Sequence, residues 1–332
     1  MREITIGTNE AGQRLDKFLA KYLRQAGKSF LYKMIRKKNI TLNGKRCEGA
    51  EKLAEGDVVR LFLSEETIEK FSGPQPAAVK TFAEASADAS AALDILYEDD
   101  DILLFNKPVG MLSQQGEGGE ASAVEYLIQY LLRTGAVTQE ELKSFRPSVC
   151  NRLDRNTSGI LTAGKSLQGL QFLSRLFRER SIHKYYQCIV SGEVKKTELM
   201  EGWLKKDEKT NRVSISQSQI PGSAYIKTKY EPVVTANGYS LLKVTLFTGR
   251  SHQIRAHLAS IGHPLVGDRK YGGERGPGHQ LLHSFRLEFP KLDSPQDARF
   301  SYLSGRVFQA PFPEEWKREA EKRGLQIPVS FQ

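Results

Sequence analysis

The chain has 332 residues, which is enough for two domains of which the larger can bury a full core. Hydrophobic residues make up 39% and charged residues 27% of it, an ordinary composition for a globular protein. No apolar run approaches the roughly 18 residues needed to cross a bilayer, and the first residues lack a signal-peptide core, so we expect a cytoplasmic protein. Cys47, Cys150 and Cys188 are odd in number and far apart, which excludes a disulfide framework and a Cys-x-x-Cys metal pair.

The net charge of +10 is densest at the N-terminus. Residues 1–64 carry 14 Lys and Arg against 7 Asp and Glu, whereas residues 65–91 carry 2 against 5. Such a basic excess indicates a polyanionic partner, either a nucleic acid or an anionic membrane surface.

The first 64 residues predict a helix pair followed by a short hairpin. Apolar residues recur at helical spacing in residues 13–24, with lysines and arginines on the other faces. A second helix is expected over residues 29–38, which end in a basic run. A strand at 40–42 with an Asn-Gly turn after it, and a closing strand at 58–63, complete the pattern. A basic helix could also lie on a membrane or be a solvated face, but a helix pair with a hairpin favours a compact polyanion-binding module.

Three blocks of this region resemble the small RNA-binding domain named after the fourth small-subunit ribosomal protein. They begin at Arg14, at Ile35 and at Leu53, in the order found in that domain. The resemblance implies that basic side chains of this region contact RNA. These are Arg14, Lys17, Lys33, Arg36, Lys37, Lys38 and Lys45.

Residues 65–91 are rich in Glu, Ala, Ser, Pro and Lys and show little periodicity. This composition predicts a flexible linker. We therefore expect an RNA-binding domain at 1–64, a linker at 65–91 and a catalytic domain at 92–332.

Helical and strand patterns are mixed in the second domain. A hairpin is expected over residues 95–105, with an acidic turn at its tip that favours a solvated turn over a metal site. A capping box predicts a helix over 122–135, and apolar spacing predicts another over 166–180. Residues 183–192 alternate as a strand does. These patterns predict an α+β fold.

Residues 147–161 place one carboxylate, Asp154, between Arg152 and Arg155. Small polar residues and Gly159 follow, and then an apolar strand begins. A neighbouring guanidinium favours the charged form of a carboxylate, so we expect Asp154 to be ionised and held in place, as a nucleophile must be. Taken alone, the three residues would more often be a surface Arg-Asp-Arg pair in a turn.

Residues 241–268 predict a strand, a Gly-Arg turn and a helix that Gly262 closes. Three histidines within twelve residues suggest zinc. His252 and His257, however, are five residues apart, which places them about 140° apart around a helix, so they cannot share one ion. We expect no metal.

Four blocks of this domain resemble the pseudouridine synthases of the RluA family, which includes enzymes that act on large-subunit ribosomal RNA. The resemblance covers nearly all of residues 93–311. The chain departs from the family at Asn151, where a histidine is usual, and at Ser113-Gln114, where a histidine is frequent. The blocks are Lys107-Pro108-x-Gly110, Arg152-Leu153-Asp154-Arg155-x-Thr157-Ser158-Gly159, Lys184-x-Tyr186-x-x-x-Val190-x-Gly192, and Thr248-Gly249-Arg250-Ser251-His252-Gln253-Ile254-Arg255 with its continuation to Asp268.

The resemblance implies a mixed, mainly antiparallel sheet flanked by helices, and it implies roles for individual residues. Asp154 is the catalytic carboxylate, Arg255 pairs with it, and Tyr186 lies against the target base and can take its proton. Whether Asp154 attacks the anomeric carbon, adds to the base or removes a sugar proton stays open. The resemblance also implies substrate contacts from Arg152, Arg155, Lys107, Arg250, His252 and Gln253.

Turning a uridine into pseudouridine neither adds nor removes atoms, so we expect no cofactor and no metal. The expected partner is RNA, namely ribosomal RNA or a ribosome assembly intermediate, and we expect a monomer without a membrane partner. Two other classes stay open. A glycosidase would use a second carboxylate as its acid, and we identify none among the motif residues. An RNA-binding protein that has lost catalysis would have a changed Asp154, which is intact.

Overall fold

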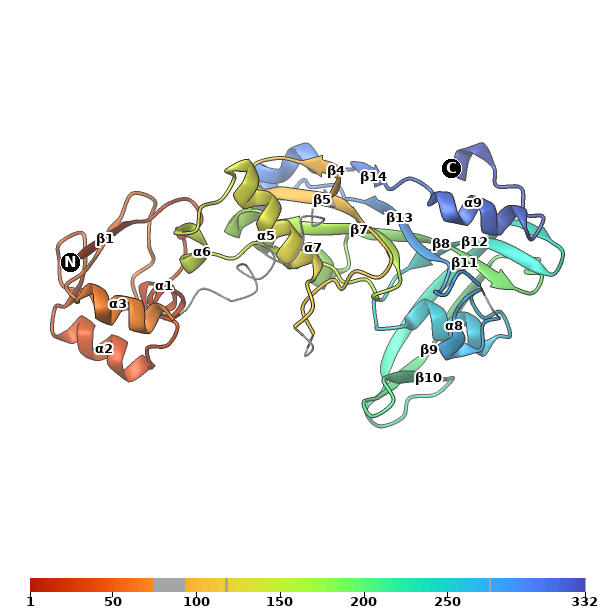
Figure 1. Ribbon diagram of the computed structural model, residues 1–332, viewed down its shortest axis with the longest axis horizontal. Coiled ribbons are helices and arrows are strands. Elements are labelled where there is room, and N and C mark those ends of the chain that lie inside the picture. The colour runs from red at the N-terminus through yellow and green to blue at the C-terminus, as the bar shows by residue number, and fades with distance from the viewer. Residues whose placement is uncertain (74–92, 117–118, 275, 332) are drawn as a thin grey trace.

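The computed structural model describes residues 1–73, 93–116, 119–274 and 276–331. They form a small N-terminal unit and a much larger one built around a long sheet, and the N-terminal unit lies at one end of the molecule beside α6 (Figure 1). Within this described part, no helix is long and apolar enough to span a membrane.

The N-terminal unit packs a helix pair against a three-stranded antiparallel sheet of order β1-β3-β2. Leu15, Phe18, Leu19 and Tyr22 are buried on one face of α1, as the apolar spacing predicts. The hairpin strands also lie where the sequence predicts them. The elements of this unit are β1 (Arg2–Thr5), α1 (Leu15–Tyr22), α2 (Lys28–Arg36), β2 (Ile40–Leu42), β3 (Val58–Leu61) and α3 (Glu65–Ser72).

The helix α3 corrects the expected linker, which was predicted to begin at residue 65. Ser64 caps this helix by accepting a hydrogen bond from the Thr67 backbone N–H at 3.2 Å. Ile68 is fully buried in the N-terminal core, and Phe71 packs against that core. The first domain therefore includes residues 65–72, because two apolar side chains of this segment pack in or against the core of that domain. Most of the expected linker, residues 74–91, lies outside the described residues.

The large unit contains an 11-stranded sheet of order β10-β9-β11-β12-β8-β13-β7-β5-β4, in which β14 also pairs with β13 and β6 with β7. Its pairs are antiparallel except for β13 with β7, so the predicted mixed, mainly antiparallel sheet is confirmed. Its strands are β4 (Asp94–Glu98), β5 (Ile102–Lys107), β6 (Ser148–Val149), β7 (Ser158–Gly164), β8 (His183–Ser191), β9 (Glu198–Asp207), β10 (Arg212–Ser216), β11 (Ala224–Ala236), β12 (Tyr239–Leu246), β13 (Leu282–Glu288) and β14 (Val307–Gln309).

Three helices of this unit, α5, α7 and α8, lie at positions that the sequence predicts, whereas α6 and α9 were not predicted. Ser122 and Glu125 form the expected capping box, and Gly135 ends the helix α5 in the left-handed conformation. The acidic turn is not simply solvated, because Asp101 is buried and accepts hydrogen bonds from Ser166 and Arg299. The helices are α5 (Ala123–Thr134), α6 (Glu141–Ser144), α7 (Leu167–Glu179), α8 (Gln253–Ser260) and α9 (Glu314–Glu321), with 3-10 turns η1 (Arg269–Tyr271), η2 (Pro295–Leu303) and η3 (Val329–Phe331).

The parallel contact between β7 and β13 explains the glycine of the Asp154 motif. Gly159 pairs with Ser284 and has a φ of +111°, and a Cβ at this position would lie 2.2 Å from the Ser284 carbonyl oxygen. Only glycine allows two backbones to approach this closely. The start of β7, and with it the end of the Asp154 loop, is therefore fixed against β13.

The two units meet through polar contacts. Tyr22 donates a hydrogen bond to Glu140 Oε1 at 2.8 Å, and Ser144 donates one to Glu10. Glu10 and Ser144 are both buried. The N-terminal unit thus contacts the segment that contains α6 at defined positions.

Candidate active site

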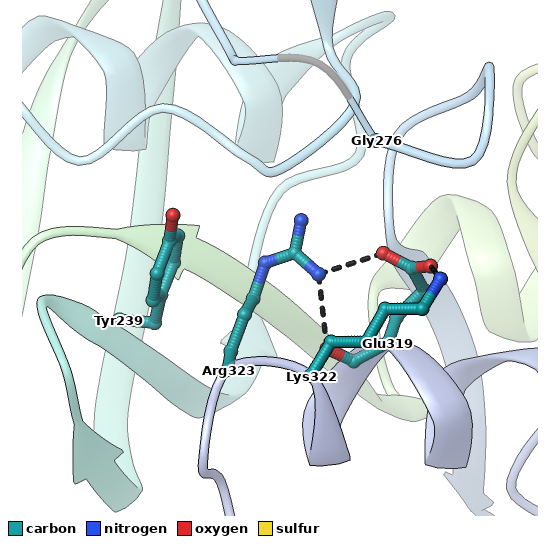
Figure 2. A pocket seen from close by; sticks show the side chains of 5 residues that line it. All are labelled: Tyr239, Gly276, Glu319, Lys322 and Arg323. Carbon is teal, nitrogen blue, oxygen red and sulfur yellow. Dashed lines mark hydrogen bonds and ion pairs between the residues drawn. The ribbon is translucent and has the colours of Figure 1, made fainter.

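A surface pocket between β12 and α9 is not the site that the motifs predict (Figure 2). Arg323 donates a hydrogen bond to Glu319 at 2.6 Å, and its guanidinium lies 5.1 Å from the centre of the Tyr239 ring. Lys322 also pairs with Glu319, at 2.7 Å. These cations already have carboxylate partners, so the pocket offers RNA phosphates little free charge. It is lined by Tyr239, Gly276, Glu319, Lys322 and Arg323, and no predicted site residue is among them.

The loop that carries Asp154 connects β6 to β7 and is fixed on both sides of the carboxylate. The Ser113 hydroxyl donates to the Leu153 carbonyl at 2.8 Å and accepts from the Leu153 N–H at 2.9 Å. The Gly110 N–H donates to the Arg155 carbonyl at 2.9 Å. Asp154 therefore sits on a preorganised loop, and its side chain is 25% exposed, so a ligand can reach it.

Lys107 also supports this loop, and its side chain does not reach solvent. Its side chain is fully buried, and Nζ donates to the carbonyls of Pro108 at 2.8 Å, Met111 at 2.8 Å and Arg155 at 3.0 Å. Burial lowers the pKa of the Lys107 ammonium to about 7, although the negative charge of Asp154 opposes this shift. The predicted substrate contact of Lys107 is thus corrected, because its Nζ binds three carbonyl oxygens inside the protein.

We expect Lys107→Met to destabilise the protein and to slow turnover without weakening RNA binding. The substitution leaves three buried carbonyl oxygens without this donor, which costs about 2–4 kcal/mol in the free energy of unfolding. Thermal unfolding, kcat and KM measure the two effects, with exposed Lys291→Met as the control. A raised KM at an unchanged melting temperature would instead mean that Lys107 contacts RNA.

Asn151, which stands where the family usually has histidine, has a structural partner in β7. Its Oδ1 accepts from the Thr162 N–H at 2.8 Å, and its Nδ2 donates to the Ile160 carbonyl at 3.1 Å. The amide therefore joins the loop to the following strand on both of its polar atoms, so the departure from the family leaves the loop supported.

Arg255 on α8 lies between two carboxylates. Its Nη1 donates to Asp154 Oδ2 at 3.0 Å, while Nε and Nη2 donate to the two oxygens of Asp268 at 2.7 and 2.9 Å. Its side chain is 9% exposed. Burial alone would lower the pKa of the Arg255 guanidinium, but the two carboxylates together raise it above its usual value. The structure thus brings together Asp154 and Arg255, which the resemblance pairs.

His252 also lies beside Asp154. Its Nε2 is 3.9 Å from Asp154 Oδ2, and its Nδ1 is 2.8 Å from the Tyr271 hydroxyl, which in turn accepts from the Val213 N–H at 3.0 Å. Burial lowers the pKa of His252, although Asp154 opposes the shift, so the ring is neutral at pH 7. The residue has a positive φ of 56° immediately before α8.

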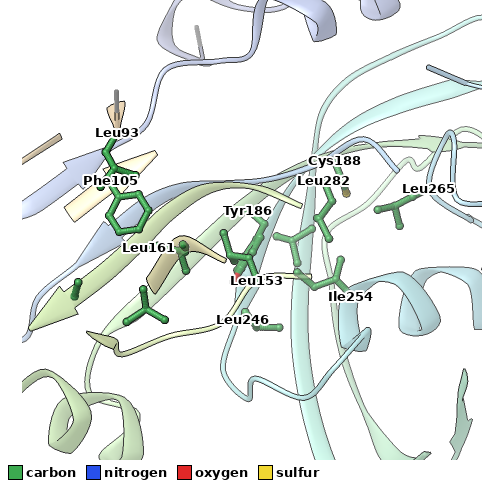
Figure 3. Close-up of a cluster of buried hydrophobic side chains, with 14 of the residues drawn as sticks. Leu93, Phe105, Leu153, Leu161, Tyr186, Cys188, Leu246, Ile254, Leu265 and Leu282 are labelled. Atoms are coloured by element: carbon green, nitrogen blue, oxygen red, sulfur yellow. The ribbon is translucent and has the colours of Figure 1, made fainter. Parts of the chain in front are cut away.

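Tyr186 lies on β8 within the main hydrophobic core, near Leu153 of the Asp154 loop (Figure 3). It is 6% exposed, and its backbone pairs with that of Ser284 in β13. Burial raises the pKa of the Tyr186 phenol to about 12, and the charge of Asp154 adds to this shift. Tyr186 therefore stays protonated at neutral pH and presents a hydroxyl group, not a phenolate.

The remaining predicted contacts divide into buried and exposed side chains. Gln253 is 2% exposed, and its amide binds Thr248, Thr228 and neighbouring backbone groups, so the predicted substrate contact of Gln253 is also corrected. Its amide groups are used to join α8 to β11. The side chains of Arg152, Arg155 and Arg250 are exposed and can reach RNA, although Arg155 also pairs with Glu120 at 2.6 Å.

The seven basic residues predicted to bind RNA are all exposed on the N-terminal unit. Arg14 forms a two-pronged pair with Asp16, at 3.0 and 2.9 Å, so its charge is partly used within the domain. The others leave their ammonium or guanidinium groups at the surface of α1, of α2 and of the turns that follow α2, where phosphates can approach.

Asp268 and Tyr271 are site residues that the sequence analysis missed. Asp268 is the last residue of the fourth motif block, so a second carboxylate does lie in the motif blocks, and the prediction that they contain none is wrong. An arginine on an apolar helix face is buried and needs a carboxylate to pair with its charge. The contact of Asp268 with Arg255 could have been suspected for this reason. No local signal indicates that Tyr271 would reach both His252 and β10.

These residues form a site that pairs the Asp154 carboxylate with a fixed cation and leaves the carboxylate partly exposed. The guanidinium of Arg255 supplies a charge-assisted hydrogen bond from a fixed direction. The neutral imidazole of His252 and the phenol of Tyr186 can serve as further hydrogen-bonding groups. Such an arrangement suits attack or proton removal by Asp154 on a bound substrate.

The sequence pattern of the family described as RNA pseudouridylate synthase matches residues 101–260, and that of the S4 domain matches residues 13–59. The chain is 32% identical over 312 residues to the ribosomal large subunit pseudouridine synthase C of Vibrio vulnificus (strain CMCP6), covering 89% of this chain and 90% of that relative. It is 31% identical to an uncharacterized RNA pseudouridine synthase of Aquifex aeolicus (strain VF5), covering 92% of each.

A solved structure shows the same fold. Human RNA pseudouridylate synthase domain containing 4 aligns with a TM-score of 0.57 at 18% identity, over 70% of this chain and 94% of that one. The predicted resemblances to an S4-type domain and to the pseudouridine synthases are confirmed by these matches. The chain belongs to the RNA pseudouridylate synthase family.

Proposed function

We propose that this protein converts specific uridines of large-subunit ribosomal RNA to pseudouridine, with Asp154 as the catalytic carboxylate. The observation that carries the proposal is the ion pair of Asp154 with Arg255 at 3.0 Å, on a fixed loop whose carboxylate remains partly exposed. The choice of ribosomal RNA rests on relatives that are named as ribosomal large subunit enzymes.

In the proposed reaction the bond between the ring nitrogen and the anomeric carbon breaks, the uracil turns, and a ring carbon rejoins the sugar. The proton on that carbon leaves, and a proton is bound at the freed nitrogen, so atoms and charge balance. Asp154 takes part in breaking and forming these bonds, and Arg255 holds its carboxylate in a fixed orientation. Tyr186 packs against the base. Because burial raises its pKa to about 12, its hydroxyl acts as a hydrogen-bond donor, and it would accept the base's proton only by passing on its own.

The target uridine must leave its helix before Asp154 can reach its sugar. Flipping a base out costs a few kcal/mol, and contacts of basic residues with phosphates offset that cost. Exposed Arg152 and Arg250, near the site, suit such contacts. His252 beside Asp154 would instead offer a hydrogen bond to the substrate. The N-terminal basic residues would bind the RNA farther away. Because the proposed substrate is ribosomal RNA or an assembly particle, we place the reaction in the cytoplasm.

A glycosidase mechanism fits this site less well, although Asp268 is a second carboxylate close to Asp154. Asp268 has a side chain that is 1% exposed, and both of its oxygens accept hydrogen bonds from Arg255. It cannot approach a leaving group as a general acid. The site therefore offers one reactive carboxylate.

The direct test of the function is pseudouridine mapping of ribosomal RNA from cells with and without the gene, followed by reaction of the purified protein with a large-subunit RNA transcript. We expect one or a few uridines to lose modification in the deletion and to regain it in the reaction. An unchanged map would contradict the proposal.

We expect the N-terminal basic surface to contribute RNA affinity and not chemistry. Replacing Lys33, Arg36 and Lys37 together by glutamine removes three exposed charges from α2 and its C-cap in the full-length protein. The slope of log affinity against log salt should flatten by about 2–3 units, while kcat at saturating RNA should change little.

The matched control replaces Lys291, Lys317 and Arg318, which lie outside the N-terminal unit, by glutamine. It removes the same total charge and should leave the slope nearly unchanged. Equal slopes for the two triple variants would mean that α2 is not a nucleic-acid surface. A large fall in kcat for the α2 variant would mean that this helix helps to form the active site.

A further inference from the structure

Asp268 holds Arg255 by two of its three guanidinium nitrogens. Asp268 Oδ2 accepts from Nε at 2.7 Å and Oδ1 accepts from Nη2 at 2.9 Å, so that the carboxylate and the guanidinium lie fork to fork. The side chain of Asp268 is 1% exposed and that of Arg255 is 9% exposed. The third nitrogen, Nη1, is thereby directed at Asp154.

The loop that carries Asp268 has little room to move. The Asp268 N–H donates to the Leu265 carbonyl at 3.1 Å, and the Gly273 N–H donates to the Asp268 carbonyl at 2.8 Å. A Cβ on Gly267 would lie 1.9 Å from the His279 carbonyl oxygen, and one on Gly273 would lie 2.0 Å from that of Leu265. Backbone packing this close fixes the Asp268 carboxylate before any substrate binds.

Directing one nitrogen of a long arginine side chain at one partner costs much conformational freedom. A second partner that already holds the side chain reduces this cost. The second carboxylate also divides the positive charge of the guanidinium. Asp154 therefore meets a cation whose charge is already partly balanced, which leaves its own negative charge more available for reaction.

Resting on the proposed function, we propose that Asp268 is a positioning residue of the reaction. It aims Arg255 Nη1 at Asp154 and balances part of the guanidinium charge, without touching the substrate itself. Its effect on turnover passes through Arg255.

A double-mutant cycle tests this dependence. We expect Asp268→Asn in the full-length protein to lower kcat about 10- to 100-fold, with KM and RNA affinity within about twofold of wild type. In an Arg255→Lys background the same substitution should cost little more, because the residue through which it acts is already changed. A purely structural role would lower kcat by the same factor in both backgrounds and would overturn the proposal.

Asp268→Glu serves as a second variant should the asparagine variant fold poorly. It keeps the buried charge but moves the carboxylate by one methylene, so kcat should fall while the protein remains folded. Wild-type kcat in folded Asp268→Glu would overturn the proposal. Asp154→Asn measured in parallel separates the two hypotheses: activity in that variant contradicts the proposed function, whereas loss of activity there with normal Asp268 variants contradicts this inference alone.

Discussion

Asp154→Asn is expected to reduce kcat by about 10⁴-fold or more while the protein folds and binds RNA as before. The change removes the negative charge that the reaction uses and almost no volume. Arg255 stays bound to the two oxygens of Asp268, so the substitution leaves no unpaired buried cation. Single-turnover formation of pseudouridine on a large-subunit RNA transcript measures the loss, and circular dichroism and RNA affinity measure what is retained.

The matched control is Asp94→Asn. Asp94 is an exposed aspartate of β4 that accepts a hydrogen bond from the Asn106 side chain at 2.9 Å, so the same chemical change is made at a carboxylate that is not among the predicted site residues. We expect its kcat to equal that of wild type. Turnover near the wild-type rate by folded Asp154→Asn would remove Asp154 from the chemistry, and the assignment of the site would fail with it.

Arg255→Lys should cost about 10²- to 10³-fold in kcat and should also lower the melting temperature. One arginine reaches Asp154 and both oxygens of Asp268 with three separate nitrogens, and lysine has a single nitrogen that cannot satisfy both carboxylates. Weakening a buried ion pair by changing one partner costs about 3 kcal/mol in the free energy of unfolding. The rate should therefore be measured at a temperature where the variant is fully folded.

The control for this substitution is Arg24→Lys, at an exposed position of the N-terminal unit. Because an exposed arginine gains little from its planar shape, we expect wild-type kcat and an unchanged melting temperature. If the two variants behaved alike, the pairing of Arg255 with both carboxylates would not matter to turnover, and its role in orienting Asp154 would be wrong.

Local patterns predicted most of the secondary structure because the forces involved act over a few residues. The capping box at Ser122 and Glu125 gives α5 its start, and the apolar spacing of α1 matches the side chains that the core buries. The helix α3 was missed because its eight residues contain only Ile68 and Phe71 as large apolar side chains, a pattern too short to recognise beside a polar stretch.

Motifs indicated which residues matter more reliably than they indicated how. Lys107 and Gln253 lie in motif blocks and were expected to touch RNA, yet both are buried and use their polar atoms inside the protein. A motif records that a position needs a given side chain. Whether that side chain faces the substrate or supports a neighbouring loop depends on burial, which the residue types alone do not give.

The sequence by itself determined the family, the S4-type domain, the α+β class and Asp154 as the candidate carboxylate, because these depend on residue types at short, ordered spacings. Tertiary structure alone decided that Asp154 and Arg255, 101 residues apart, meet at 3.0 Å with Asp268 behind them. It also placed Tyr271 between α8 and β10, and Tyr186 in the core beside the Asp154 loop. These contacts form only when distant strands pair, since the direction of a side chain across a sheet is set by register and close packing, and neither is encoded within one segment.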